Sequence, residues 1–260
     1  FVILIMINVF INILKNKNFF VILKKIFKRF EKDTSIEAEK WAKSNTYQTT
    51  EEFCRLIDSS LYEEIEPEIN SLEEYAENKL LNLSVKLGGS GNYKLLYFLI
   101  RKIKPINVVE TGVAAGWTSL AILRALKKNG KGFLYSSDFP YFRLKNPEQY
   151  IGYLAKDEIN KKDWFLDIRG DDIALSEIMR QLNSNSIDLF HYDSDKSYTG
   201  KTNAIEILKS KISSKTIIIF DDIQNNFHFR DFVEKNQKTF RILKFQGKYL
   251  GILNYEVLFN

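Results

Sequence analysis

The chain has 260 residues, of which 45% are hydrophobic and 27% are charged. This is long enough for one α/β domain with an N-terminal addition. The lone cysteine, Cys54, excludes an intrachain disulfide and favours a reducing, cytoplasmic setting. Six of the 38 basic residues and none of the 33 acidic residues lie in the first 30 positions. The remainder is nearly neutral, which argues against nucleic acid as a partner.

The first 30 residues differ in composition from the rest of the chain. Residues 1–14 are mostly apolar, but they are fewer than the roughly 20 residues needed to cross a bilayer. Residues 19–30 have two faces at helical period. The apolar face holds Phe19, Ile22, Leu23, Ile26, Phe27 and Phe30, and the basic face holds Lys24, Lys25, Lys28 and Arg29. This pattern predicts either peripheral contact with an anionic membrane, at its inner face, or a helix packed on the body or on a second copy in a homo-oligomer.

Residues 31–87 have the pattern of helices. Thr49–Glu52 matches a capping box that opens one helix, Pro67 opens or breaks another, and Ser71 offers a further start. Gly88–Gly91 then interrupts the pattern, either as a plain linker or as the edge of a binding site.

The chain is therefore expected to have three parts. Residues 1–30 form a basic amphipathic segment, residues 31–90 a helical cap, and residues 91–260 the main domain. The main domain opens with a helix over residues 93–102, which Lys104 and Pro105 stop.

An acid and two glycines follow the first apolar run of the main domain. Residues 106–110 have the character of a buried strand, and residues 118–128 that of a helix. Gly112 and Gly116 let the turn between them approach a ligand closely, and the helix start would face a polar or anionic group. A dinucleotide-binding turn needs Gly-x-Gly-x-x-Gly, but Ala114 stands at its second glycine. The turn resembles the first motif of the class I S-adenosylmethionine-dependent methyltransferases.

Strand and helix patterns alternate after Pro105, which predicts a mostly parallel sheet. Strands are expected at residues 106–110, 132–137, 164–168, 187–192 and 216–220, and helices at residues 118–128, near 147–160, and at 173–182, 199–209 and 227–235. The last two strands, residues 240–245 and 249–257, are separated by three residues and must form an antiparallel hairpin. The fold class is thus a Rossmann-like, doubly wound, seven-stranded sheet. A class I methyltransferase sheet ends with such a reversed strand, which the usual dinucleotide fold lacks.

In an open α/β sheet the ligand lies beyond the carboxyl ends of the strands. The resemblance assigns Asp138 to the ribose hydroxyls, Asp171 or Asp172 to the adenine, Glu110 to the methionine end of the cofactor, and Thr118 to its carboxylate. The two glycines would complete the binding site. Asp138 could equally bind a dinucleotide or form a turn before Pro140, and either Asp171 or Asp172 could cap the following helix.

Acids also end the fourth and fifth strands. Asp193, Asp195, Asp221 and Asp222 would gather negative charge at one sheet edge, and all-oxygen ligands suit Mg²⁺, Ca²⁺ or Mn²⁺. The order and spacing of Asp193, Asp221 and Asp222 resemble metal-dependent small-molecule O-methyltransferases of the catechol and sugar types. The resemblance implies that these three residues bind a divalent cation, Mg²⁺ first among the candidates. The alternative is a set of helix caps and turn residues.

In addition to Asp193, three residues are candidates for accepting the proton of the acceptor hydroxyl. Lys196 matches the base lysine of catechol-type enzymes, although related bacterial members more often have histidine there. His191 shares a strand face with Asp193 by alternation but also suits a core position, and His228 follows the acid pair and could approach a substrate.

We therefore expect a methyltransferase that transfers the methyl group of S-adenosylmethionine to a hydroxyl of a small acceptor, such as a sugar, a phenol or a natural product. Two alternatives are an NAD(P)-dependent oxidoreductase and a non-catalytic Rossmann-like protein tethered by its N-terminus.

Overall fold

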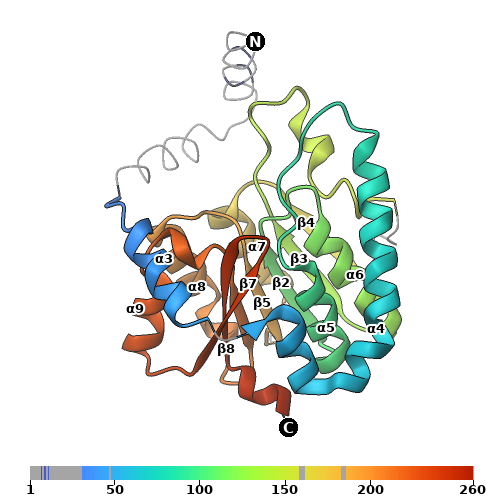
Figure 1. Ribbon diagram of the computed structural model, residues 1–260. Helices are drawn as coiled ribbons and strands as arrows, with labels where there is room; N and C mark the ends of the chain where they lie inside the picture. The colour runs from blue at the N-terminus through green and yellow to red at the C-terminus, as the bar shows by residue number, and fades with distance from the viewer. Residues whose placement is uncertain are drawn as a thin grey trace.

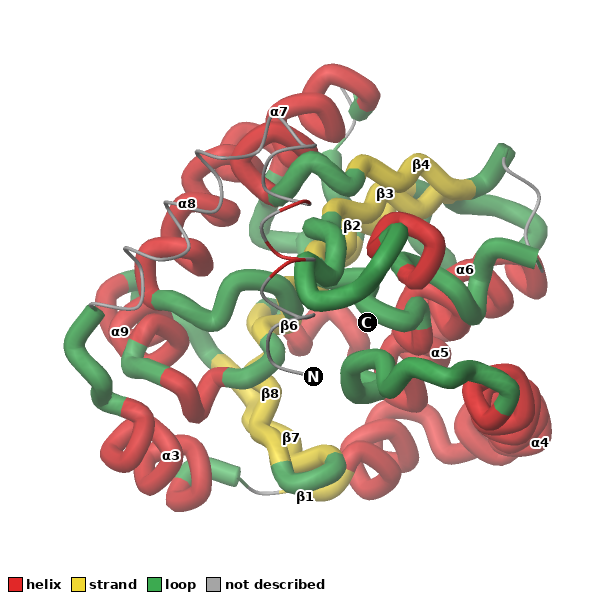
Figure 2. The backbone as a smooth tube through the Cα atoms, turned by 90° about the horizontal axis from the view of Figure 1, so that it is seen from above, coloured by secondary structure: helices red, strands yellow, loops and turns green. Residues whose placement is uncertain are grey.

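The computed structural model describes residues 7, 9, 11, 31–46, 48–157, 162–182 and 186–259. Helices cover both faces of a central sheet, giving three layers (Figures 1 and 2). The helices are α3 (Ser35–Ser44), α4 (Thr50–Leu81), α5 (Tyr93–Ile103), α6 (Trp117–Asn129), α7 (Asp171–Gln181), α8 (Tyr198–Leu208) and α9 (His228–Lys235). The strands are β1 (Gln48–Thr49), β2 (Asn107–Thr111), β3 (Phe133–Ser137), β4 (Trp164–Asp167), β5 (Leu189–Tyr192), β6 (Ile217–Phe220), β7 (Phe240–Phe245) and β8 (Lys248–Leu253).

The strand order of the sheet is β1-β7-β8-β6-β5-β2-β3-β4. Only β8 runs antiparallel to its neighbours, β6 and β7, and every other pairing is parallel. The predicted fold class is confirmed, including the terminal hairpin. The sequence did not predict β1, a two-residue strand that extends the hairpin edge by pairing with β7.

Both faces of the central strands are buried, as expected for a parallel sheet. Alternate residues of β6 point to opposite sides, so Ile217 and Ile219 pack in the core under α4, α5 and α6, while Ile218 and Phe220 pack in the core under α8 and α9. Figure 2 shows the two helical layers on either side of the strands. Because the sheet interior is filled, a ligand can reach the strands only at their ends.

The helical cap differs from its predicted outline. Thr49 does form a capping box with Glu52, but α4 then continues through both Pro67 and Ser71, so the predicted break and restart are wrong. The irregular position is Asp58 (φ −161°, ψ 91°), whose carboxylate accepts the backbone N–H of Leu61 at 3.0 Å. Buried residues at helical spacing, including Ile65, Ile69, Leu72 and Ala76, hold α4 against the domain core. This packing overrides the local signals.

The helix expected near residues 147–160 is also wrong. One 3-10 turn, Pro147–Tyr150, is followed by turns to residue 157, and residues 158–160 lie outside the described part. The backbone N–H groups of Gly152 and Leu154 instead donate to the carbonyls of Ala114 and Ala115, each at 2.9 Å. This segment therefore supports the glycine turn after β2.

Two further predictions concern the ends of the chain. The last strand stops at Leu253 rather than residue 257, because Asn254 has a φ of +55° and Tyr255–Phe259 forms a 3-10 helix. The amphipathic stretch 19–30 lies outside the described residues. Within the described part, no helix combines the length and apolar character needed to span a bilayer.

Candidate active site

The turn between β2 and α6 requires its first glycine. Gly112 has a φ of +82°, and a Cβ atom there would lie 2.0 Å from the carbonyl oxygen of Asp193. The backbone of this turn is tied to both neighbouring strands, since Gly112 N–H donates to Ser137 O and Asp193 N–H donates to Thr111 O, each at 2.9 Å. Gly116 (φ +95°) faces the backbone of Gly152. Glycine thus allows three chain segments to meet at the end of β2.

Glu110 lies beneath this turn and is fully buried. Its carboxylate accepts hydrogen bonds from the hydroxyls of Thr118 (2.6 Å), Ser119 (2.6 Å) and Ser136 (2.9 Å). Burial raises the pKa of Glu110 to about 7, against the effect of the three hydroxyls. In the described structure Glu110 and Thr118 bond to each other and fix the start of α6. Their predicted contacts with the cofactor stay a prediction.

A cavity of about 150 Å³ opens at the carboxyl ends of β2, β3 and β4, and we name it the cofactor pocket. Its lining includes Gly112, Asp138, Asp171 and Asp172, all predicted from the sequence to contact the cofactor. Asp138 accepts the backbone N–H groups of Ala114 (2.6 Å) and Phe139 (2.5 Å). Asp171, the first residue of α7, accepts the hydroxyls of Ser137 and Ser194. Four predicted residues from three separate loops therefore converge on one pocket.

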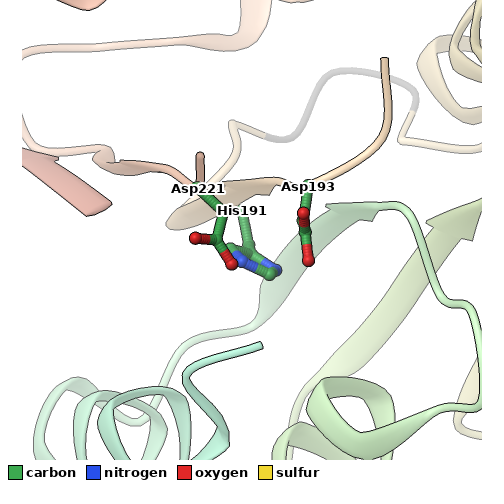
Figure 3. A group of neighbouring side chains, drawn as sticks. All are labelled: His191, Asp193 and Asp221. Atoms are coloured by element: carbon green, nitrogen blue, oxygen red, sulfur yellow. The ribbon is translucent and has the colours of Figure 1, made fainter. Parts of the chain in front are cut away.

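A second group of side chains lies at the ends of β5 and β6. His191, Asp193 and Asp221, which we name the acidic centre, each offer one ligand atom within 4.8 Å of the others (Figure 3). His191 and Asp193 share a side of the chain because they are two residues apart on an extended backbone, and Asp221 follows the adjacent strand. Desolvation and repulsion from neighbouring carboxylates raise the pKa values of Asp193 and Asp221. This crowding of acids is the electrostatic condition that a bound cation would relieve.

His191 contributes the neutral side chain of the acidic centre. Its side chain is 2% exposed, and burial lowers its pKa to about 4, so the imidazole is uncharged at neutral pH. Its Nδ1 atom lies 4.0 Å from Glu110 Oε1 and has no hydrogen-bond partner among the described residues. A neutral imidazole beside two carboxylates is a common donor set for transition-metal dications.

Asp222, the third predicted metal ligand, lies near the acidic centre but is not one of the three residues whose ligand atoms lie within 4.8 Å of one another. It adopts left-handed backbone dihedrals (φ +51°), and its buried carboxylate contacts Lys196 Nζ at 2.6 Å and Lys248 Nζ at 3.3 Å. Despite burial, these two lysines hold its pKa below the usual range. The structure thus brings together two of the three predicted ligands and has His191 where the sequence predicted Asp222. Asp195 is outside the acidic centre as well, with its carboxylate accepting the N–H of Ser197 at 3.0 Å.

The sequence did not single out Lys201 or Lys248. Lys201 is 1% exposed and donates to the carbonyl of Asp222 at 3.0 Å, and burial lowers its pKa to about 8. Its spacing from Ala204 and Leu208 places it on the buried face of α8, a signal that the sequence does contain. Lys248 begins β8, and only the antiparallel pairing of β8 with β6 brings it beside Asp222.

His228 does not join the acidic centre. Its ring is 3% exposed and packs among Tyr198, Phe220 and Phe232, with centroid distances of 5.2, 5.3 and 6.1 Å. Burial lowers its pKa to about 3. It lines a separate cavity between α8 and α9, and its approach to a substrate stays a prediction.

The Gly88–Gly91 segment, which we name the glycine loop, lies over the acidic centre. A Cβ atom on Gly91 would lie 2.7 Å from Thr118 Cγ2, 3.6 Å from Asp193 Oδ2 and 3.8 Å from Asp221 Oδ2. Gly88 lies near Ala114 and Tyr141 of the cofactor pocket in the same way. The sequence left open whether the glycine loop is a plain linker or the edge of a binding site, and these contacts support the edge of a site.

Comparison with known proteins agrees with this arrangement. Residues 109–223 match a family model described as a methyltransferase domain, a range that includes the cofactor pocket and the acidic centre. Among curated proteins, no sequence match was found.

Several solved structures share the fold at low sequence identity. The O-methyltransferase from Bacillus cereus, in complex with SAH, is 14% identical with a TM-score of 0.54, covering 71% of this chain and 90% of that one. The SAH-bound Podospora anserina methyltransferase PaMTH1 is 14% identical with a TM-score of 0.52, covering 70% and 86%. TomG from Streptomyces achromogenes, an O-methyltransferase involved in tomaymycin synthesis and bound to SAM, is 14% identical with a TM-score of 0.50, covering 70% and 86%.

The domain match and the fold together confirm the class predicted from the sequence. Residues 109–223 match a methyltransferase domain and the sheet has the topology expected of a class I enzyme, so the expectation of an S-adenosylmethionine-dependent methyltransferase is confirmed at this level. The alternatives of a nicotinamide-dependent oxidoreductase and of a non-catalytic protein are set aside.

Proposed function

We propose that this protein is an O-methyltransferase that uses S-adenosylmethionine and a divalent cation to methylate a hydroxyl of a small acceptor, such as a sugar, a phenol or a natural product. The observation that carries the proposal is the position of the acidic centre beside the cofactor pocket. Asp193 belongs to both, since it lines the pocket and lies within ligand distance of His191 and Asp221. A methyl donor and an activated hydroxyl would therefore meet at Asp193.

The cofactor would bind across the ends of β2, β3 and β4. Asp138 would accept hydrogen bonds from the ribose hydroxyls, and Asp171 or Asp172 would face the adenine amino group. The Gly112 turn would let the cofactor approach the backbone, and the start of α6 would face its carboxylate. These roles rest on the family resemblance and on the shared pocket of these residues.

The acidic centre fits a divalent cation by its donor chemistry. It combines two carboxylates of raised pKa with a neutral imidazole that has an unpartnered buried nitrogen. Because one donor is nitrogen, the set favours a transition-metal dication such as Mn²⁺ over the Mg²⁺ expected from oxygen ligands alone. When bound, such a cation would lower the pKa of an acceptor hydroxyl.

The remaining chemistry is direct methyl transfer. With S-adenosylmethionine bound, the acceptor oxygen would form the O–CH₃ bond as the S–CH₃ bond breaks and S-adenosylhomocysteine leaves, and the hydroxyl proton would pass to the carboxylate oxygen of Asp193 that does not bind the cation. We place the proton there because Asp193 is the one residue of the acidic centre that also lines the cofactor pocket. Lys196, the base expected from the resemblance, donates to Asp222 at 2.6 Å and is 57% exposed, so it is engaged in an ion pair. Alignment of the oxygen with the sulfonium methyl would supply most of the rate enhancement.

Calorimetric titration with S-adenosylmethionine and with NAD(H), each with and without Mn²⁺ or Mg²⁺, tests the cofactor. We expect S-adenosylmethionine to bind and NAD(H) not to bind, and the absence of S-adenosylmethionine binding would overturn the proposal. A labelled-methyl screen over sugars, phenols and catechols then tests the reaction. Lys196→Met and His228→Ala should retain turnover within about tenfold, whereas a loss of a hundredfold or more in Lys196→Met would return the base role to Lys196.

We also propose that residues 19–30 bind an anionic membrane from the cytoplasmic side, because their basic face complements anionic lipid. Co-sedimentation of the full chain and of a chain lacking residues 1–30 with anionic liposomes tests this, and equal binding by both chains would contradict it. Sedimentation of the same two chains without lipid would show whether the segment instead links two copies.

A further inference from the structure

A small cavity of about 40 Å³ lies between the glycine loop and the turn that joins β7 to β8. Asp221 is part of its lining, so this cavity borders the acidic centre, and among the described residues it shares no lining residue with the cofactor pocket. The Ser90 hydroxyl donates to the side-chain oxygen of Gln246 at 2.8 Å and closes the cavity on its outer side. An acceptor group held in this cavity would lie beside Asp221.

Lys248 is the cation in the lining of this cavity. Its ammonium lies 3.3 and 3.4 Å from the two oxygens of Asp222, and its side chain is 41% exposed. Lys196 contacts the same carboxylate more closely, at 2.6 Å, and Gln224 Nε2 donates to it at 3.0 Å. One carboxylate is thus shared by two lysines and an amide. Lys248 has the longer contacts of the two lysines, and an ammonium has three N–H donors to satisfy.

The charges around the acidic centre favour an anion at this position. Three carboxylates, Asp193, Asp221 and Asp222, face three ammonium groups, those of Lys196, Lys201 and Lys248. A divalent cation would pair with Asp193 and Asp221, and the sulfonium of the cofactor would add a further positive charge near the two lysines that contact Asp222. A bound acceptor that carries negative charge would restore the balance, and Lys248 lines the cavity where such a group would lie.

We propose that Lys248 selects acceptors that carry an anionic group, a carboxylate or a phosphate, beside the hydroxyl that is methylated. This inference rests on the proposed methyltransferase function and specifies its substrate class. Lys248 acts as a specificity-determining residue, since its role is to pair with the anion and not to handle the transferred methyl group or the proton.

The test is a labelled-methyl assay on matched acceptor pairs that differ only in charge. One arm compares 3,4-dihydroxybenzoate with its methyl ester, and a second arm compares glucose 6-phosphate with glucose. Each pair is assayed with the wild type, with Lys248→Met and with Lys244→Met. Lys244 is an exposed lysine on β7, so the control variant removes the same charge from the neighbouring strand.

We expect the anionic member of at least one pair to be methylated with the higher kcat/KM. Lys248→Met should lower the ratio of kcat/KM between the anionic and neutral members by about tenfold, through KM of the anion, and Lys244→Met should leave that ratio unchanged. Which arm responds distinguishes a carboxylate from a phosphate. Three results would overturn the inference. They are equal methylation of both members of each pair, an unchanged kcat/KM ratio in Lys248→Met, and cofactor binding without methylation of any anionic acceptor. Failure to bind S-adenosylmethionine would instead overturn the proposed function.

Discussion

The two ends of the candidate site satisfy their carboxylates in different ways. In the cofactor pocket, the carboxylates of Asp138 and Asp171 accept hydrogen bonds from backbone N–H groups and serine hydroxyls. At the acidic centre, Asp193 and Asp221 repel each other, and lysines supply the nearby positive charge. Neutral donors fix the geometry of a carboxylate without cancelling its charge, which suits the cofactor-binding role proposed for this pocket. A charged site suits a reaction in which the hydroxyl loses a proton.

Gly112 joins these two regions, and its substitution gives the largest expected effect. In Gly112→Ala the new Cβ would overlap the Asp193 carbonyl, which is 2.0 Å away, and the residue would keep a positive φ. Overlap and left-handed strain together should lower the free energy of unfolding by about 4 kcal/mol, measured by urea denaturation. Gly130→Ala is the matched control, because Gly130 also has a positive φ (+69°) but no neighbour within 4 Å. It should cost about 1 kcal/mol, and equal losses in the two variants would contradict the packing argument.

The strand pattern was enough to place the candidate residues of the cofactor pocket near one another but not those of the acidic centre, for a physical reason. Gly112, Asp138, Asp171 and Asp172 come from loops that directly follow consecutive strands β2, β3 and β4, so the strand pattern alone brings them to one edge. The acidic side depends on side-chain orientation as well. Asp221 and Asp222 are neighbours in the chain, yet Asp221 lies within ligand distance of Asp193 while the carboxylate of Asp222 contacts Lys196 and Lys248.

The fold shows the same division between local and long-range information. The hairpin β7–β8 was predicted because two strand patterns flank a short turn. The segment after Pro147 was predicted to be helical, yet its backbone pairs with Ala114 and Ala115, residues more than 30 positions earlier. Lys248 reaches Asp222 across an antiparallel pairing. Periodicity contains no information on such contacts.

The raised pKa of Glu110, beneath the glycine turn, can be tested through the pH dependence of stability. Its folded-state pKa is raised to about 7 from a reference of 4.5, so its contribution to stability is fully present below pH 4.5 and is lost as the pH rises through 7. The free energy of unfolding should fall by about 3 kcal/mol over this range because of Glu110. In Glu110→Gln this loss should be absent, as measured by urea denaturation between pH 4.5 and 8 with a chelator present. Glu148→Gln, at an exposed position, should follow the wild type, and a parallel curve for Glu110→Gln would contradict the assignment.

Cation binding tests which residues form the acidic centre. Asp221→Asn removes a proposed ligand and should weaken Mn²⁺ binding by more than about a hundredfold, measured by calorimetry on the wild type and the variant. Asp222→Asn is a stringent control, because it changes the adjacent residue in the same way but leaves His191, Asp193 and Asp221 in place. We expect it to weaken binding by about tenfold at most. Equal losses would restore Asp222 to the ligand set predicted from the sequence.

The smallest expected effect concerns the cofactor pocket. Asp138 lines the pocket, and its two carboxylate oxygens accept the N–H groups of Ala114 and Phe139. Asp138→Asn would remove the negative charge that strengthens hydrogen bonds from ribose hydroxyls and would replace one of these acceptors with an NH₂ group. Affinity for S-adenosylmethionine should fall by about tenfold in calorimetric titration, while Mn²⁺ affinity should stay within about twofold of the wild type. Asp163→Asn, at an exposed position before β4, is the control and should change neither affinity. The backbone at Gly112 connects the cofactor pocket with the acidic centre. If Asp138→Asn also weakened Mn²⁺ binding by about tenfold, the two regions would be electrostatically coupled, which would contradict the comparison.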